Sequence, residues 1–367
     1  MMFESLGSRG YCRDKRCSSS ERAGTELGVN RPEEVPPIVD SIDNSELICG
    51  DVGVVHARQS ITRCHRAVAA RSPDGLNGAG YARLMSKQSR ANSAGHSSGQ
   101  RVIVMTGASS GIGEVTADRL HRAGWIVIGA SRRGTSSGGW KPLVMDVDND
   151  ASVAQGVSSV LAEYGRIDAA VACAGWGLAG AVEATPIADA KAQLETNFWG
   201  ATRLVQSVLP TMRAQGAGRL VLMSSIGGVL GIPFQAYYSA SKFAMEGYGE
   251  SLAYEVAPFG IGVTLVQPGN VRTDFTASRK QVGMPHAGTD DDAYSAAAAK
   301  AIGVMEHDEL NGVSPDAVAK VVERMLNARR PPRRVSVGKV DERVGIVGKR
   351  LLPYRLYERA ARSSLGV

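Results

Sequence analysis

The sequence predicts an α/β protein with a doubly wound parallel sheet over residues 101–367. Two features support this: short continuous apolar runs alternate with helical patterns, and a glycine-rich turn separates the first run from the first helix. Strands that are apolar throughout are typical of parallel sheets, which helices cover on both faces. Right-handed crossovers then bring the carboxyl ends of the strands to one ligand-binding edge.

Strands are expected at residues 102–105, 125–131, 143–146, 169–174, 220–223, 262–267 and 334–337. The clearest helical pattern between them spaces apolar side chains by three or four residues, at Leu194, Phe198, Ala201, Val205, Val208 and Met212. This spacing predicts one helix with a single buried face.

The first strand leads directly into a glycine-rich turn. The turn contains Thr106, Gly107, Ser109, Ser110, Gly111, Ile112 and Gly113. Glycines let the backbone approach a phosphate closely, and the N-terminus of the following helix supplies free N–H donors. The order strand, turn, helix therefore indicates a nucleotide site, although an ordinary tight turn would share the glycines.

Tyr238 and Lys242 lie four residues apart within a helical pattern, so they share one helix face. Free tyrosine titrates near ~10, and a nearby ammonium favours the tyrosinate. We therefore expect Lys242 to lower the pKa of Tyr238 and to make it a usable general acid or base. The alternative for this motif in isolation is a solvated helix face.

Several further motifs follow in order along the chain. They are Asp146-Val147, Ala174-Gly175, Asn197, Ser225 thirteen residues before Tyr238, and Pro268-Gly269 with Thr273. Together with the turn and the Tyr–Lys pair, they resemble the short-chain dehydrogenase/reductase family over residues 101–275. Residues 225–234 and 241–247 are similar to its hydroxysteroid and retinol dehydrogenase branch. The resemblance implies a Rossmann-type fold, a homodimer or homotetramer, and an alcohol or ketone substrate that is apolar.

The resemblance also implies roles for these residues. Tyr238 would transfer the proton, Lys242 would hold the nicotinamide ribose, Ser225 would orient the substrate oxygen, and Asn197 would hold a water. Asp146 would contact the adenine and Thr273 the carboxamide. The alternatives are purely structural roles: a helix cap for Asp146, a capping or kink amide for Asn197, and ordinary turn residues for Ser225, Ala174, Gly175 and Gly269.

The end of the second strand reads Ser131-Arg132-Arg133, where an acidic residue would bind the ribose hydroxyls of NAD. A guanidinium group suits a 2′-phosphate. NADP is therefore the expected cofactor, with NAD as the alternative, and Arg132 and Ser109 are the expected contacts. Cys173 stands where the family often has asparagine, and we expect it to be a structural thiol.

Residues 1–100 are expected to form a low-order extension, because their Ser-, Arg-, Gly- and Asn-rich composition cannot bury a core. No apolar signal segment follows the first Met, and the acidic residues argue against a transit peptide. Met85 is an alternative start, so residues 1–84 are expected to be dispensable.

The net charge of +6 comes mainly from scattered basic residues, so no nucleic-acid partner is expected. The exception is a run at residues 329–334. The cysteines, at positions 12, 17, 49, 64 and 173, match no zinc spacing, so we expect no metal and reduced thiols in a cytoplasmic protein.

Residues 276–312 are expected to form a lid over the substrate. The basic, partly amphipathic tail from Leu351 onward suggests dimer packing or, second, a weak contact with a membrane surface. The leading functional prediction is an NADP-dependent oxidoreductase. The alternative is a nucleotide-binding sensor or scaffold with little turnover, which would have no need of Ser225 and Tyr238 together.

Overall fold

The protein is described by a computed structural model that covers residues 99–282 and 294–365. The predicted extension lies outside the described residues except for its last two positions, and so do residues 283–293 of the predicted lid. All the described residues belong to one compact unit, residues 71–367.

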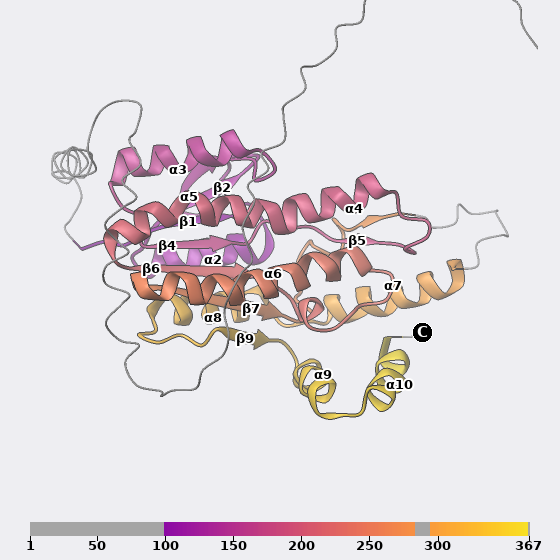
Figure 1. The fold of residues 1–367 in the computed structure, drawn as a ribbon. Coiled ribbons are helices and arrows are strands. Elements are labelled where there is room, and N and C mark those ends of the chain that lie inside the picture. The colour runs from indigo at the N-terminus through magenta and orange to yellow at the C-terminus, as the bar shows by residue number, and fades with distance from the viewer. Residues whose placement is uncertain (1–98, 283–293, 366–367) are drawn as a thin grey trace, which may run out of the picture. The chain divides into compact units, whose positions relative to one another are not determined.

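A seven-stranded, wholly parallel sheet forms the centre of this unit (Figure 1). Its order is β3-β2-β1-β4-β6-β7-β9. The strands are β1 (Val102–Thr106), β2 (Ile126–Ser131), β3 (Lys141–Val144), β4 (Ala169–Ala172), β6 (Gly218–Met223), β7 (Ile261–Pro268) and β9 (Arg334–Val337). The chain adds strands outward from β1 in one direction and then from β4 in the other, which confirms the predicted doubly wound fold.

Helices cover both faces of the sheet because successive strand residues point to opposite sides. Val102 and Val104 of β1 join a core cluster with α3 (Asp150–Tyr164), α5 (Gly200–Gln215) and α6 (Ala236–Val256). Ile103 and Met105 join the opposite cluster with α2 (Gly111–Arg122) and α8 (Pro315–Asn327). The inner strands β2, β1, β4, β6 and β7 are therefore buried on both faces, as their unbroken apolar sequences require.

Two predicted elements differ in detail. β3 begins and ends two residues earlier than expected. This edge strand is largely exposed and starts at the exposed Lys141, whereas Met145, which looked like part of the strand because it is apolar, is buried just after the strand ends. The single helix expected from residue 194 to 212 is interrupted. It consists of α4 (Ile187–Leu194), a π-helical turn η2 (Glu195–Trp199) and α5.

Smaller elements lie beyond the carboxyl ends of the strands. β5 (Leu178–Ala179) pairs in parallel with β8 (Lys280–Gln281), and α7 (Ser295–Leu310) follows in the lid region. The chain ends in α9 (Val340–Leu351) and α10 (Tyr354–Leu365), which lie beside one another after β9 (Figure 1). Among the described residues, no helix combines the length and the apolar character that crossing a membrane requires.

Candidate active site

The glycine-rich turn after β1 meets the end of β4 and the loop after β7. Thr106 Oγ1 accepts hydrogen bonds from the backbone N–H groups of Cys173 (3.2 Å) and Ala174 (3.3 Å). A Cβ atom added to Gly111 would lie 3.5 Å from the Thr273 side chain. The sheet therefore brings together the turn, the β4 end and the β7 loop, which the sequence places far apart.

Glycine is required at two positions of this turn. Gly107 has a φ of +69°, and a Cβ there would lie 2.7 Å from the Ala174 nitrogen. A Cβ at Gly113 would lie 2.0 Å from the Gly107 carbonyl oxygen. The side chain of Ser110, at the start of α2, makes no capping hydrogen bond, so the first N–H groups of the helix are left for a ligand. This narrow cradle fits the phosphates of a dinucleotide.

Two arginines follow β2, and they lie differently. Arg133 Nη2 donates to the backbone oxygen (3.1 Å) and to Oγ (3.0 Å) of Ser109 in the turn. Arg132 is exposed and lies close to Asp148. Burial raises the pKa of Asp148, whereas its hydrogen bond with Thr196 and the positive charge of Arg132 lower it. Arg132 is the contact expected first from the sequence, and its neighbour Arg133 is the one whose guanidinium reaches the glycine-rich turn.

Asp146 and Val147 lie after β3. Asp146 Oδ1 accepts from the Asp148 N–H at 3.1 Å, whereas the cap of α3 is Asn149, whose Oδ1 accepts from Ser152 N at 2.9 Å. The helix-cap alternative for Asp146 is therefore wrong. Val147 is buried.

Tyr238 and Lys242 share one face of α6, as their spacing predicts. The ammonium lies 5.9 Å from the centroid of the phenol ring, and Nζ donates to the carbonyl oxygen of Met223 at 2.8 Å. That carbonyl ends β6, so α6 presents both side chains at the ligand-binding edge.

The expected lowering of the Tyr238 pKa is wrong for this structure. Burial raises the pKa of Tyr238 to about 12; a hydrogen bond with Ser225 lowers it, Glu309 raises it and Arg279 lowers it. Burial also lowers the pKa of Lys242 to about 8, partly offset by Cys173. The reason is that enclosure disfavours both the phenolate and the ammonium, and the ammonium is directed at Met223. At neutral pH Tyr238 is therefore a phenol, which can donate a proton.

Ser225 and Asn197 are both buried beside this pair. Ser225 Oγ accepts from the Gly227 N–H at 3.0 Å, so the serine also starts a short 3₁₀ turn. Asn197 lies in the π-helical turn; its Oδ1 accepts from Trp176 N (3.0 Å) and its Nδ2 donates to Trp176 O (3.1 Å). Irregular π turns often occur at functional sites, and this one directs the amide to the backbone that follows β4.

Cys173 lies at the end of β4 near Lys242. Burial raises the pKa of its thiol to about 11, and Lys242 lowers it only in part. The thiol is therefore protonated at neutral pH, which argues against a nucleophile and agrees with the structural role expected for it.

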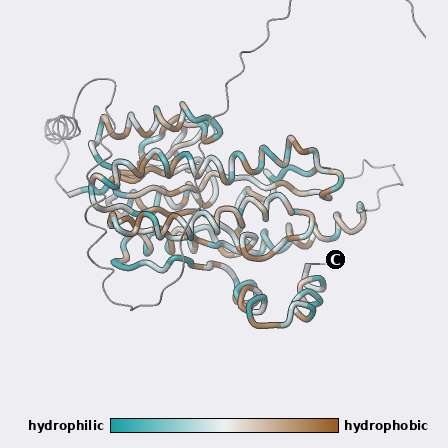
Figure 2. The backbone as a smooth tube through the Cα atoms, in the orientation of Figure 1, coloured by the Kyte–Doolittle hydropathy of each residue, from teal (hydrophilic) through white to brown (hydrophobic). Residues whose placement is uncertain are grey.

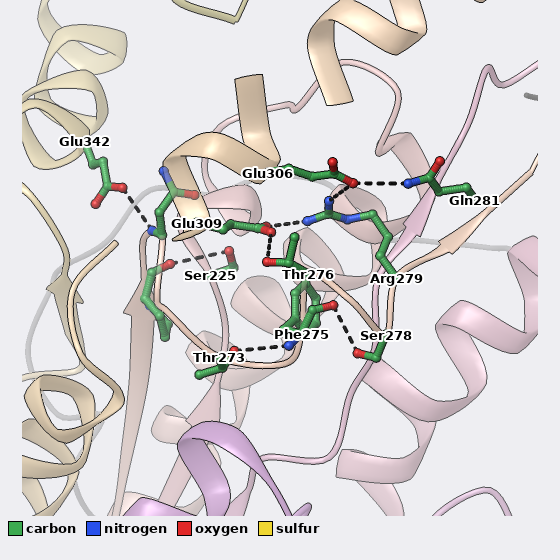
Figure 3. A network of polar contacts seen from close by, with 12 residues as sticks. Ser225, Thr273, Phe275, Thr276, Ser278, Arg279, Gln281, Glu306, Glu309 and Glu342 are labelled. Carbon is green, nitrogen blue, oxygen red and sulfur yellow. Dashed lines mark hydrogen bonds and ion pairs between the residues drawn. The ribbon is translucent and has the colours of Figure 1, made fainter. Parts of the chain in front are cut away.

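The segment that follows β7 lies against Tyr238 through Phe275 and against α7 through Arg279. Figure 3 shows the polar contacts of this segment. The Phe275 ring packs edge-on against the Tyr238 ring, with centroids 5.9 Å apart. Arg279, whose side chain is fully buried, forms an ion pair with Glu309 of α7, and Glu309 also accepts from Thr276 Oγ1 at 2.6 Å. No sequence pattern predicts this pair, because thirty residues separate its members.

Pro268, Gly269 and Thr273 complete the β7 side of the site. The Pro268 carbonyl oxygen accepts from Ser225 Oγ at 3.5 Å, and Gly269 N donates to Val337 O at 2.7 Å. Thr273 Oγ1 accepts from the Phe275 N–H at 3.3 Å. Apolar side chains gather between β5, α7 and the loop that precedes Tyr238; they are Ala179, Ile232, Phe234, Ile302 and Met305.

Comparisons with known proteins agree with this geometry. Residues 101–282 match the family model described as short chain dehydrogenase. The chain is 40% identical over 263 residues to a 3-ketodihydrosphingosine reductase of Bacteroides thetaiotaomicron, covering 71% of this chain and 97% of that protein. It is 36% identical to retinol dehydrogenase 8 of Bos taurus, covering 64% of this chain and 80% of that protein.

A solved short-chain dehydrogenase from Streptomyces avermitilis has the same fold. The two chains are 31% identical and superpose with a TM-score of 0.62, covering 73% of this chain and 99% of that one.

Proposed function

Because the chain belongs to the short-chain dehydrogenase/reductase family and is an NAD(P)-dependent oxidoreductase, we propose that it reduces a long-chain apolar ketone with NADPH. The observation that carries this proposal is the buried phenol of Tyr238, which shares one face of α6 with Lys242 and whose pKa Ser225 lowers. Support for the substrate class comes from the 3-ketodihydrosphingosine reductase relative, which the match covers almost completely, and from the apolar cluster at α7.

In the proposed reaction Tyr238 Oη donates its proton to the carbonyl oxygen. The reduced nicotinamide, when bound, supplies the hydride for the carbonyl carbon, so the ketone becomes a secondary alcohol. Ser225 Oγ hydrogen-bonds the same oxygen and orients it. The raised pKa of Tyr238 keeps the phenol protonated before the transfer.

Lys242 is proposed to hold the nicotinamide ribose, and Asn197 to hold a water through which Tyr238 regains its proton. Asp146 and Val147 would contact the adenine, and Thr273 the carboxamide. Ala174, Gly175, Pro268 and Gly269 are small or rigid residues that let the dinucleotide lie close to the strand ends.

NADP is the proposed cofactor because Arg133 contacts Ser109 in the glycine-rich turn. The end of β2 and the two residues after it read Ser131-Arg132-Arg133, so no carboxylate stands where NAD would need one. A bidentate guanidinium suits the 2′-phosphate. We expect Arg133→Gln to raise the KM for NADPH by about tenfold and to leave the KM for NADH unchanged, since each charge-assisted contact contributes roughly 1.5–3 kcal/mol. Equal effects on both cofactors would contradict this assignment.

The experiment that tests the function follows NADPH oxidation with 3-ketodihydrosphingosine, a long-chain plain ketone and a short ketone. We expect turnover with the long-chain ketones and weaker activity with NADH. Tight NADPH binding without turnover of any ketone or alcohol would favour the sensor or scaffold alternative.

A further inference from the structure

Helix α9 presents an exposed apolar stripe. Val340, Val344, Val347 and Leu351 follow at steps of four, three and four, so they lie on one helix face. Their exposed fractions are 75%, 61%, 53% and 77%. The exposed apolar side chains continue after α9 with Leu352, Tyr354 and Leu356. Figure 2 shows hydrophobic and hydrophilic segments alternating along both terminal helices.

An arginine-rich groove of about 790 Å³ adjoins this stripe between α8, β9 and α9. The arginines that line it are Arg324, Arg333, Arg334, Arg343 and Arg350, and Val347 of the stripe lines it too. Across residues 99–282 and 294–365, only Arg334 of these five pairs with carboxylates, those of Glu246 and Glu250. The groove therefore carries uncompensated positive charge directly beside apolar surface.

The charge decides which partner fits. In a symmetric dimer of this chain the same patch would face itself, and the arginines would repel one another. A nucleic acid would match the arginines but not the aliphatic stripe. A membrane with anionic lipids matches both, because aliphatic side chains enter the acyl boundary while arginines contact the head groups. We propose that α9, α10 and the arginine groove form a docking surface for anionic lipid membranes.

The docking surface is attached to the active-site loop. Glu342 of α9 accepts from the Asn270 N–H at 2.9 Å and from the Lys339 N–H at 2.8 Å (Figure 3). A Cβ at Gly269 would lie 2.1 Å from a Glu342 oxygen, so α9 packs closely on this loop. The same loop carries Thr273 and Phe275. Docking through α9 would therefore bring the candidate active site to the membrane, in which apolar ketones dissolve.

The test is cosedimentation of the full chain with vesicles of phosphatidylcholine, with and without phosphatidylglycerol. We expect binding only when phosphatidylglycerol is present and loss of binding at high salt, which screens the arginines. The double variants Val344→Asp/Leu351→Asp and Arg343→Gln/Arg350→Gln should each weaken binding by about tenfold or more, since each basic residue near an anionic surface contributes about 1 kcal/mol.

The matched controls are Val182→Asp and Arg122→Gln/Arg213→Gln, which change exposed residues elsewhere on the chain and should bind vesicles as the parent does. Reduction of a water-soluble ketone by every variant shows that it is folded. Vesicle binding that persists in the α9 variants, or that ignores phosphatidylglycerol, would overturn the proposal. A dimer, measured by light scattering, that dissociates in Val344→Asp/Leu351→Asp while the parent binds no vesicles would assign the stripe to a second copy instead.

Discussion

At the scale of single residues, enclosure and not a neighbouring charge dominates the chemistry of Tyr238. The Tyr–Lys spacing correctly predicts a shared helix face, but it cannot show that the Lys242 ammonium donates to the Met223 carbonyl. Nor does local spacing reveal that Glu309 and Arg279 act on the phenol from the lid region. The sequence therefore predicts Tyr238 as the acid, whereas its pKa depends on contacts that only the fold brings about.

Glu309→Gln tests this control of the phenol. Glu309 raises the pKa of Tyr238, and its removal also leaves Arg279 with only the longer ion pair to Glu306 (3.9 Å), so both effects lower that pKa. Reduction needs the protonated phenol, and activity is lost as pH rises through its pKa. The alkaline limb of kcat, measured with saturating NADPH, should therefore move to lower pH by up to about one unit, or roughly 1.4 kcal/mol.

Glu323→Gln is the matched control, because Glu323 pairs with Arg119 between α2 and α8 and touches none of the site residues. Its alkaline limb should coincide with that of the parent. A Glu309→Gln limb that stays in place or moves to higher pH would show that the carboxylate does not act on Tyr238.

At the scale of elements, apolar runs located the strands because buried parallel strands have no polar face. The predicted bounds of the edge strand β3 are wrong by two residues, because this strand is largely exposed and its sequence is not an unbroken apolar run. The π-helical turn at Asn197 was hidden because residues on both sides keep helical spacing. Helix α10 was foreseen only as an amphipathic tail from Leu351 onward, and α9 was not predicted, because its exposed stripe gives no core-facing pattern.

The glycine-rich turn offers a prediction at this scale. In Gly113→Ala the new Cβ would meet the Gly107 carbonyl oxygen at 2.0 Å, so the turn must shift away from its phosphate-binding position. We expect the Kd for NADPH, measured by fluorescence titration, to rise at least about tenfold. The free energy of unfolding should fall by about 1–3 kcal/mol, the usual cost of overpacking.

Gly303→Ala is the control for that substitution. Gly303 is inside α7, and among the described residues no heavy atom beyond its own helix backbone and chain neighbours lies within 4 Å of a Cβ placed there. Alanine should stabilise this helix by about 0.5–1 kcal/mol and leave the NADPH affinity unchanged. Equal losses of affinity in both variants would mean that the turn is not the phosphate site.

At the scale of the whole molecule, the family match and the sheet begin at nearly the same residue. The family model begins at residue 101, and β1 begins at Val102. One sheet brings together the carboxyl ends of β1, β4, β6 and β7, and none of these strands begins before Val102. Composition predicts a division near residue 100, because periodic apolar sequence is concentrated in the later part.

A chain that starts at Met85 tests this division. It keeps every residue of the sheet and of the site, so its thermal unfolding midpoint and its kcat/KM for ketone reduction should equal those of the full chain within about twofold, less than 0.5 kcal/mol. Loss of folding or activity would show that residues 1–84 contribute to the catalytic unit.

The most direct measurement is ketone reduction by Tyr238→Phe compared with the parent enzyme, together with its NADPH affinity. The substitution removes one hydroxyl and keeps the ring that packs on Phe275. We predict an unchanged Kd for NADPH and a kcat lower by about 10²–10⁴-fold, the range of general acid catalysis. Undiminished turnover in a correctly folded variant would show that another group supplies the proton.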